Sequence, residues 1–397
     1  MKFPIYLDCH STTPLDPDAL AAMMPYLTND FGNASSKSHC FGWKAEVAVE
    51  KARDRVAKLL GAHPKEIVFT SGATESNNFS LKGVAEAYAD RGKHIITSQT
   101  EHKCILATCA WLEKKGYSVT YLPVDETGQV RVADVKAAIR PDTILISIMA
   151  ANNETGTIQP LAEIGALARE NNVLLHTDAA QAVGKIPIDV NAMKIDLLSL
   201  SAHKFYGPKG VGAVYVRRKD PRVVPAPLLY GGGQENGHRS GTLNVPGIVG
   251  MGLAAMKAAE HMADEVGRLS YLRDKLFNGL KERLGAVHLN GHPTDRLPGS
   301  LNVSFPFVES DSLVASLKTI AISSTSACMS AAAVPSYVLA AMCLESDRIH
   351  GSVRFGLGRF TTEEEIVYTV DTVSQVVRQL QKSSPLFALS ETAGPQS

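Results

Sequence analysis

The feature that most limits what this chain can fold into is a regular alternation between short apolar runs and segments whose apolar residues recur at helical spacing. Strands that are apolar throughout are typical of a parallel sheet that is covered by helices on both faces. The pattern predicts strands at residues 66–70, 94–98, 118–122, 143–149, 173–178, 197–200 and 212–216. It predicts helices at residues 18–24, 43–60, 75–89, 104–115, 133–139 and 161–170. The sequence therefore indicates an α/β fold with a mostly parallel sheet.

A second, smaller α/β unit is expected towards the C-terminus. A chain of 397 residues is longer than one compact core usually takes. In this part the pattern predicts helices at residues 251–284 and 363–380 and strands at residues 300–305 and 352–357. We predict a large domain over residues 16–256, a small domain made of residues 1–15 and 257–385, and a flexible tail over residues 386–397.

The charges of the chain balance, with 40 Lys and Arg residues against 40 Asp and Glu residues. This balance gives no electrostatic basis for binding nucleic acid or an anionic membrane, and we expect neither as a partner. No apolar run is long enough to span a bilayer, and the first residues lack the pattern of a secretory signal. We therefore expect a cytoplasmic enzyme that acts on a small molecule.

The cysteines are scattered, which is typical of free thiols in a long chain. Some of them lie close to a histidine, so a zinc site is an alternative, but the sequence contains no CxxC pair and we expect no metal. The six cysteines are Cys9, Cys40, Cys104, Cys109, Cys328 and Cys343.

Polar clusters follow several of the predicted strands at the point where each strand ends. In an open α/β sheet the carboxyl ends of parallel strands meet at one crevice, where ligands bind. We therefore expect these side chains to converge on one site. The clusters are residues 100–102, residues 151–156, Asp178 with Gln181, and residues 201–204.

Lys204 and Asp178 together indicate pyridoxal phosphate (PLP) chemistry. A lysine in a partly dry pocket loses its proton more easily and can condense with the PLP aldehyde. A carboxylate at a strand end can keep the pyridine nitrogen of PLP protonated, which makes the ring an electron sink. Lys204 alone would more often be a solvated loop lysine, and the upstream Asp178 changes that balance.

A phosphate site is expected where the strand at 66–70 turns through Ser71 to Thr74 into a helix. Exposed N–H groups and the helix dipole favour an anion there, and Thr74 adds a hydroxyl. A simple N-cap by Thr74 is the alternative, and the two interpretations are compatible. His102 alone would usually be structural, but in this series it could stack on a flat ring.

Two further segments carry candidate residues. Residues 31–39, with Asn33, form an irregular polar loop of a kind that often carries sites, although a surface connection is commoner. Residues 322–333 are small, polar and poorly patterned, which suits a mobile loop with one thiol, Cys328. An inert loop cysteine is the alternative for Cys328.

Six motifs occur in one order, and with them the chain resembles the cysteine desulfurases. It is most similar to the IscS/NifS-like group of the class-V aminotransferase family, which are PLP enzymes of the aspartate-aminotransferase fold. The resemblance runs from about Ile5 to Pro385. The motifs are residues 70–77, 101–103, 178–181, 201–204, 239–242 and 326–328.

The resemblance implies a role for each matching residue. Lys204 would hold PLP covalently and move protons at the substrate α-carbon, Asp178 would pair with the pyridine nitrogen, and His102 would stack on the ring. Asn153 and Gln181 would hydrogen-bond near the phenolic oxygen. Thr74, Ser201 and His203 would bind the phosphate, together with Thr242 from the neighbouring subunit of a homodimer, and Ala73 would also bind the cofactor. Asn33 and Arg354 would bind the substrate L-cysteine, Arg354 through its carboxylate.

The resemblance also implies that Cys328, as a thiolate, takes the substrate sulfur as a persulfide and leaves L-alanine. The sulfur would pass to an acceptor, for example an iron–sulfur scaffold protein or an acceptor in tRNA thiolation. The remaining cysteines are assigned to packing. The loop departs from the family pattern at Thr325 and Met329, and a scaffold-docking extension is not recognisable after Pro385. Alternatives are a selenocysteine lyase or another aminotransferase-family enzyme, and, in a different class, an inactive sulfur-transfer scaffold.

Overall fold

The structure, a computed structural model, describes residues 1–324, 335–385 and 387, and within them the main sheet has seven strands. Its strand order is β2-β8-β7-β6-β5-β3-β4. The strands β3 to β7 pair in parallel, while β8 is antiparallel to both of its neighbours, so the prediction of a mostly parallel sheet is confirmed. The strands are β2 (Ile67–Thr70), β3 (His94–Ser98), β4 (Ser118–Leu122), β5 (Thr143–Ser147), β6 (Leu174–Asp178), β7 (Leu197–Ser201) and β8 (Gly212–Val216).

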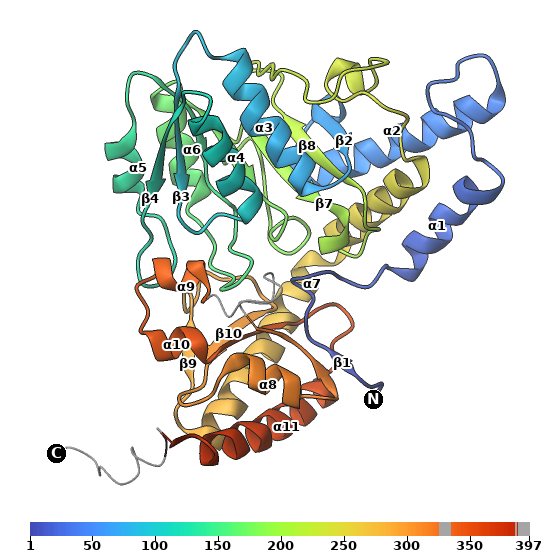
Figure 1. Cartoon of the computed structure of the whole chain (residues 1–397). Coiled ribbons are helices and arrows are strands. Elements are labelled where there is room, and N and C mark those ends of the chain that lie inside the picture. The colour runs from blue at the N-terminus through green and yellow to red at the C-terminus, as the bar shows by residue number, and fades with distance from the viewer. Residues whose placement is uncertain (325–334, 386, 388–397) are drawn as a thin grey trace.

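Helices cover both faces of the main sheet (Figure 1). Helices α3 (Ala73–Ala87) and α4 (Lys103–Glu113) pack on one face. The other face is covered by α2 (Cys40–Leu60), α5 (Val132–Ala138), α6 (Leu161–Glu170) and the first half of α7 (Val245–Leu284). Every residue of the central strands is buried, which explains why these segments are apolar throughout.

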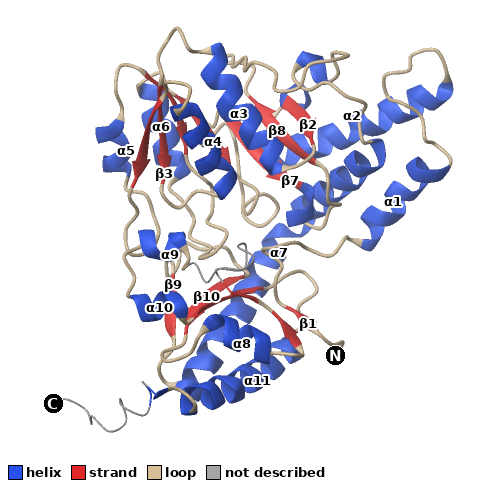
Figure 2. Cartoon of the chain, in the orientation of Figure 1, coloured by secondary structure: helices blue, strands red, loops and turns tan. Residues whose placement is uncertain are grey.

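A smaller antiparallel sheet lies below the main body, between it and two helices (Figure 2). In the described residues its order is β12-β13-β10-β9. The N-terminus joins this part, because β1 (Ile5–Tyr6) pairs with β11 (Ile320–Ala321), and Ile5 and Leu7 pack in the same core. The remaining elements are β9 (His288–Asn290), β10 (Ser300–Ser304), β12 (Ser323–Ser324), β13 (Ser352–Gly356), α1 (Pro17–Thr28), α8 (Ser310–Ser316), α9 (Tyr337–Ala341), α10 (Ser346–His350) and α11 (Glu363–Lys382).

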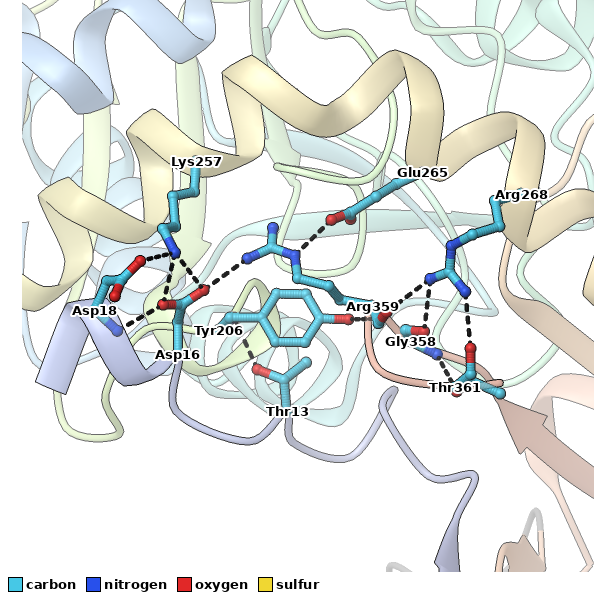
Figure 3. A network of polar contacts seen from close by, with 10 residues as sticks. All are labelled: Thr13, Asp16, Asp18, Tyr206, Lys257, Glu265, Arg268, Gly358, Arg359 and Thr361. Carbon is cyan, nitrogen blue, oxygen red and sulfur yellow. Dashed lines mark hydrogen bonds and ion pairs between the residues drawn. The ribbon is translucent and has the colours of Figure 1, made fainter. Parts of the chain in front are cut away.

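Helix α7 belongs to both cores. Ile248 and Ala254 pack in the core of the main sheet, whereas Leu272 and Leu276 pack in the core of the small sheet. Between these two stretches, polar contacts tie α7 to the N-terminal segment and to the loop after β13 (Figure 3). Arg359 there pairs with Glu265 of α7 and with Asp16. The helix predicted at residues 251–284 is therefore part of one continuous helix, α7, and the domain limits at residues 16 and 256 stay a prediction.

Some element ends differ from the sequence predictions. The strand predicted at residues 143–149 ends at Ser147 in the structure, although the backbone beyond it still bonds to β6, as in the 2.9 Å bond from Ala150 N to Asp178 O. Helix α2 begins at Cys40, three residues early, because the His39 ring accepts a hydrogen bond from Gly42 N. In the part of the chain that the structure describes, no helix combines the length and the apolarity needed to cross a membrane.

Candidate active site

The polar clusters at the carboxyl ends of β3, β5, β6 and β7 line one cavity of about 500 Å³. Its size lies in the range of pockets that hold small ligands. Side chains from the small sheet and from residues 10–11 close it from the other side. The predicted residues that line it are Ala73, Thr74, His102, Asn153, Asp178, Gln181, Ser201, His203, Lys204 and Arg354.

Lys204 ends a short 3₁₀ turn that directly follows β7. Its Nζ donates hydrogen bonds to the carbonyl oxygens of His10 (2.6 Å) and Ser11 (2.8 Å). These acceptors are neutral, so no carboxylate locks the amine as a permanent ion pair in these two contacts. The side chain is therefore held at the cavity by contacts that it can exchange.

Asp178 is the last residue of β6 and is buried at the cavity floor. Its Oδ2 accepts a 2.7 Å hydrogen bond from Nδ2 of Asn77 on α3, and its Oδ1 accepts one from Ala180 N at 3.0 Å. The Oδ1 of Asn77 is buried and has no partner among the described residues. Two donors thus fix the orientation of a carboxylate that no cation neutralises in these contacts.

His102 is the N-cap of α4, and its Nδ1 accepts a hydrogen bond from Cys104 N at 3.2 Å. The same Nδ1 lies 3.0 Å from Cys104 Sγ. Burial lowers the pKa of His102 and raises the pKa of Cys104 to about 12, so both side chains are neutral at neutral pH. His102, Cys104 and Asp178 lie close enough to share a metal ion, but a protonated thiol that already contacts the imidazole does not favour one.

The turn between β2 and α3 brings backbone N–H groups to one end of the cavity. Helix α3 begins at Ala73 with Gly72 as its N-cap, so the alternative that Thr74 is the N-cap is wrong. Gly72 has a φ of +153°, which favours glycine, and a Cβ on Gly212 would lie 2.6 Å from the Gly72 Cα. These two glycines let the turn approach the sheet beside Ser201. The N-terminus of α3 and the Ser201 hydroxyl can together bind an anion.

His203 adds an uncharged donor to this end of the cavity. Burial, and then the charges of Lys204 and Lys209, lower its pKa to about 4. Its Nδ1 contacts the Thr12 hydroxyl at 3.1 Å. A neutral imidazole can donate one N–H to a phosphate without adding a charge.

Gln181 and Asn153 contribute amide groups to the lining of the cavity. Gln181 donates from Nε2 to His10 O at 2.9 Å and accepts at Oε1 from Lys185 Nζ at 3.0 Å. The Oδ1 of Asn153 is buried and has no partner within the described ranges. Burial lowers the pKa of Lys185 to about 7.

Arg354 reaches the cavity from the middle of β13 in the small sheet. Its Nη1 donates to Asn153 O at 2.7 Å, and its Nη2 donates to Asp8 Oδ1 at 2.9 Å and to Ser11 Oγ at 2.8 Å. The guanidinium therefore bridges the two sheets through a loop that follows β5 and a segment that follows β1.

Two predicted residues, Asn33 and Thr242, do not line the cavity, and a third, Cys328, cannot be compared with it. Asn33 is exposed and caps its own turn, accepting a hydrogen bond from Ser35 N at 2.9 Å. Thr242 is also exposed, in the loop before α7. Cys328 lies outside the described residues. The roles given to these three residues stay predictions.

The structure also places residues at the site that sequence reasoning did not assign to it. These are His10, Ser11, Asn77 and Cys104. For Cys104 the assignment to packing is incomplete, because its side chain packs against the core beside α3 and α4 and also lines the cavity. The same assignment is wrong for Cys40 and Cys343, which are exposed, and right for Cys9 and Cys109, which are buried.

The charge around the cavity is mainly positive. Burial and then the charges of Lys185, Arg354 and Lys204 lower the pKa of the buried His10 well below its ordinary value. A cavity lined by the cations Lys204, Lys209 and Arg354 and by the carboxylates of Asp178 and Glu75 suits a ligand that is anionic at one end and basic at the other.

The chain matches known proteins over nearly its whole length. The aminotransferase class-V family matches residues 5–368. A cysteine desulfurase IscS from Anaeromyxobacter dehalogenans (strain 2CP-C) is 56% identical over 389 residues, which cover 98% of this chain and 96% of the relative. A cysteine desulfurase from Homo sapiens is 53% identical over 386 residues, covering 97% of this chain and 84% of the relative.

Solved structures agree with these sequence matches. A NifS-like protein superposes with a TM-score of 0.88 at 40% identity, covering 95% of this chain and all of that chain. A structure described as SspA in complex with cysteine superposes with a TM-score of 0.79 at 39% identity, covering 90% of this chain and all of that one. The prediction of a cysteine desulfurase is thereby confirmed. The chain belongs to the class-V aminotransferase family and is, within it, a cysteine desulfurase of the IscS/NifS-like group.

Proposed function

We propose that the cavity holds PLP, with Lys204 as the residue that binds it. The donor set fits this cofactor from end to end. The N-terminus of α3, Ser201 and His203 are suited to the phosphate, and Asp178 is suited to a protonated ring nitrogen. The buried Oδ1 of Asn153 and the amide of Gln181 are the polar groups between these two ends.

The residues of the chain then have separate tasks in the reaction. PLP, when bound, withdraws electrons from the substrate α-carbon. The carboxylate of Asp178, which Asn77 orients, keeps the ring nitrogen protonated, and this makes the electron withdrawal stronger. Lys204, held at the cavity by the carbonyl oxygens of His10 and Ser11, takes up and returns a proton at the α-carbon. His102 is neutral and lies at the rim, where it can stack on the ring.

The proposed substrate is L-cysteine, bound through its carboxylate by Arg354. The relatives named cysteine desulfurase and the structure of SspA in complex with cysteine support this choice. A guanidinium holds a carboxylate by two parallel hydrogen bonds, which fixes the orientation as well as the charge.

We also propose that Cys328 receives the sulfur. Its thiolate forms an S–S bond to the substrate sulfur while the substrate C–S bond breaks, and the β-carbon takes up a proton. Cysteine and a thiol thereby give L-alanine and a persulfide, with no outside oxidant or reductant. The persulfide sulfur would pass to an acceptor, such as an iron–sulfur scaffold protein or the tRNA thiolation machinery.

A homodimer is proposed from two features of the large unit. Thr242 lies away from the cavity of its own chain, which leaves it available to a partner's cavity. Large apolar side chains are exposed along α1, along the start of α2 and in the loop between them. They are Leu20, Met24, Leu27, Phe31, Phe41, Trp43 and Val47. Such a patch is typical of an interface. The domain limits and the cytoplasmic location expected from the sequence stay predictions.

The observation that carries the proposal is the convergence of Lys204, Asp178 and Arg354 on one cavity. The test is a visible absorbance spectrum of the purified protein before and after L-cysteine is added, with alanine and sulfide assayed. We expect a yellow protein whose band changes with cysteine and which releases both products. A protein that shows no band even after PLP is added would contradict the cofactor assignment.

The role of Cys328 is tested in the same assay with Cys328→Ala and with Cys40→Ala as the matched control. Cys40 is an exposed free thiol remote from the cavity lining. We expect Cys328→Ala to keep the band and lose sulfide release, and Cys40→Ala to keep both. If Cys328→Ala turns cysteine over at the unmodified rate, the persulfide assignment is wrong while the PLP assignment stands.

A further inference from the structure

The guanidinium of Arg354 already carries a carboxylate that belongs to the protein. Asp8 Oδ1 accepts a 2.9 Å hydrogen bond from Arg354 Nη2, and the side chains are only 17% and 10% exposed. The same Nη2 donates to Ser11 Oγ at 2.8 Å. An ion pair this far from solvent is screened much less than a surface pair.

The backbone holds Asp8 at this place. Residues 7 to 9 run beside the end of β13, with a 2.7 Å bond from Gly356 N to Leu7 O and a 2.9 Å bond from Cys9 N to Gly356 O. Asp8 and Gly356 form a parallel bridge, two residues along the strand from Arg354. Asp8 is therefore fixed by the same strand that presents the arginine.

The geometry of the guanidinium limits how a substrate carboxylate can bind. A guanidinium has two edges that offer parallel N–H groups, and each of these edges includes Nη2. Here both hydrogens of Nη2 are engaged by Asp8 and Ser11, and one of Nη1 is engaged by Asn153 O. The Nε is buried and has no partner in the described part of the chain. A bidentate substrate carboxylate must therefore displace Asp8, Ser11 or both.

We propose that Asp8 is a positioning residue that competes with the substrate carboxylate for Arg354. It orients the guanidinium when the site holds no substrate, and it gives up Nη2 when an α-carboxylate binds. The charge of Asp8 also lowers the positive field that the carboxylate meets as it approaches. Asp8 thereby sets the affinity for the substrate and leaves the chemical steps to other residues. This inference rests on the assignment of Arg354 under the proposed function.

The test is Asp8→Asn in the PLP-loaded enzyme, because asparagine keeps the shape and one acceptor oxygen but removes the competing charge. We expect the KM for L-cysteine to fall roughly threefold to tenfold while kcat changes less than about twofold. The affinity for L-alanine, measured by titration of the visible band, should rise by a similar factor. Asp142→Asn is the matched control, since it breaks an exposed ion pair with Arg140 and should leave the KM unchanged.

The outcomes separate this inference from the proposed function. An unchanged or higher KM in a folded Asp8→Asn enzyme overturns the competition. Arg354→Gln should raise the KM for L-cysteine strongly. If it does so while Asp8→Asn does not lower the KM, the inference about Asp8 fails and the assignment of Arg354 stands. If Arg354→Gln leaves the KM unchanged, the assignment of Arg354 is wrong and the inference falls with it. A comparison of thermal unfolding between the variants shows that each one is folded.

Discussion

The two sheets contribute to the site in different ways. The main sheet delivers His102, Asn153, Asp178 and Ser201 at or just after the carboxyl ends of its parallel strands. The small sheet delivers Arg354 from the middle of an antiparallel strand, in register with Asn302 on β10. In this protein the parallel sheet contributes residues at the carboxyl ends of its strands, which form one edge of the sheet, whereas the antiparallel sheet contributes a residue from one of its faces.

The face that the small sheet uses is the polar one. On β13 the apolar residues Val353 and Phe355 belong to the core packed against α7 and α11, and Arg354 between them points the other way. That polar side is buried too, because loops of the main sheet cover it: Asn302 Nδ2 donates to Glu154 O at 3.0 Å. We propose that this difference divides the tasks, so that residues at the strand ends of the main sheet carry out the chemistry and Arg354 of the small sheet recognises the substrate.

The largest effect is expected for Lys204→Ala at the edge of the main sheet. We expect turnover of L-cysteine to fall by about a thousandfold or more, because Lys204 is the residue proposed to bind PLP and to move the proton at the α-carbon. Sulfide and alanine assays measure the loss, and the visible spectrum shows whether PLP is bound without the lysine. Lys58→Ala, an exposed lysine on α2, is the control and should be fully active. Turnover above a tenth of the unmodified rate would contradict the assignment.

The second prediction tests the small sheet. Arg354→Gln removes the charge and the bidentate edge, so the KM for L-cysteine should rise by about a hundredfold, with a smaller change in kcat. Steady-state kinetics over a wide range of cysteine concentrations measure both constants. Arg283→Gln, an exposed arginine paired with Asp371, serves as control. A loss confined to kcat would show that the two sheets do not divide the work as we propose.

The residues of the main sheet could be predicted because strand ends follow from local sequence. An apolar run that stops at Asp178 or Ser201 indicates both the strand and the place where its last side chain lies. The partners of these residues could not be predicted in this way. The bond from Asn77 to Asp178 joins residues 101 positions apart, and the bond from Arg354 to Asp8 joins residues 346 positions apart.

The small sheet shows a second limit of sequence reasoning. Alternation of apolar and polar residues along β10 and β13 is typical of a sheet with one solvated face. Here loops of the main sheet cover that face, as in the bond from Asn302 Nδ2 to Glu154 O, and nothing in the alternation itself indicates this cover. Arg354 could therefore be assigned only through the resemblance to a family, and its ion pair with Asp8 was missed.

The third prediction concerns Glu154, which lies between the two sheets. Burial raises the pKa of Glu154 to about 7, against an ordinary value of 4.5, and its carboxylate accepts a hydrogen bond from Ser336. The folded protein holds this proton more tightly than the unfolded chain, so stability falls as pH rises from about 4.5 to about 7 and then levels off. Glu154→Gln cannot lose a proton and should not show this fall.

We therefore expect Glu154→Gln to unfold at a higher temperature than the unmodified protein at pH 8 and at a similar temperature near pH 4.5. The difference at pH 8 should be on the order of 2 kcal/mol in the free energy of unfolding. Thermal unfolding followed by circular dichroism at both pH values measures it, with Glu163→Gln on the exposed side of α6 as control. A variant that is less stable at pH 8 would show that the ionised carboxylate is needed where the two sheets meet.

The smallest effect is expected in α7, the helix that joins the two cores. Gly267 lies between the stretch that packs on the main sheet and the stretch that packs on the small one, and a Cβ there would have no heavy atom within 4 Å. Gly267→Ala should therefore stabilise the protein by about 0.5–1 kcal/mol through helix propensity alone.

Gly279 of the same helix is the matched control for Gly267→Ala, because its Cβ would lie 2.9 Å from Val370 Cγ2 and the alanine there should destabilise. Urea unfolding with two probes, one for each core, measures both variants. If α7 couples the cores, each alanine shifts the two probes together. If Gly267→Ala instead destabilises the protein, or shifts one probe alone, Gly267 is a point at which α7 bends. The main sheet and the small sheet, which together form the site, would then move as separate bodies.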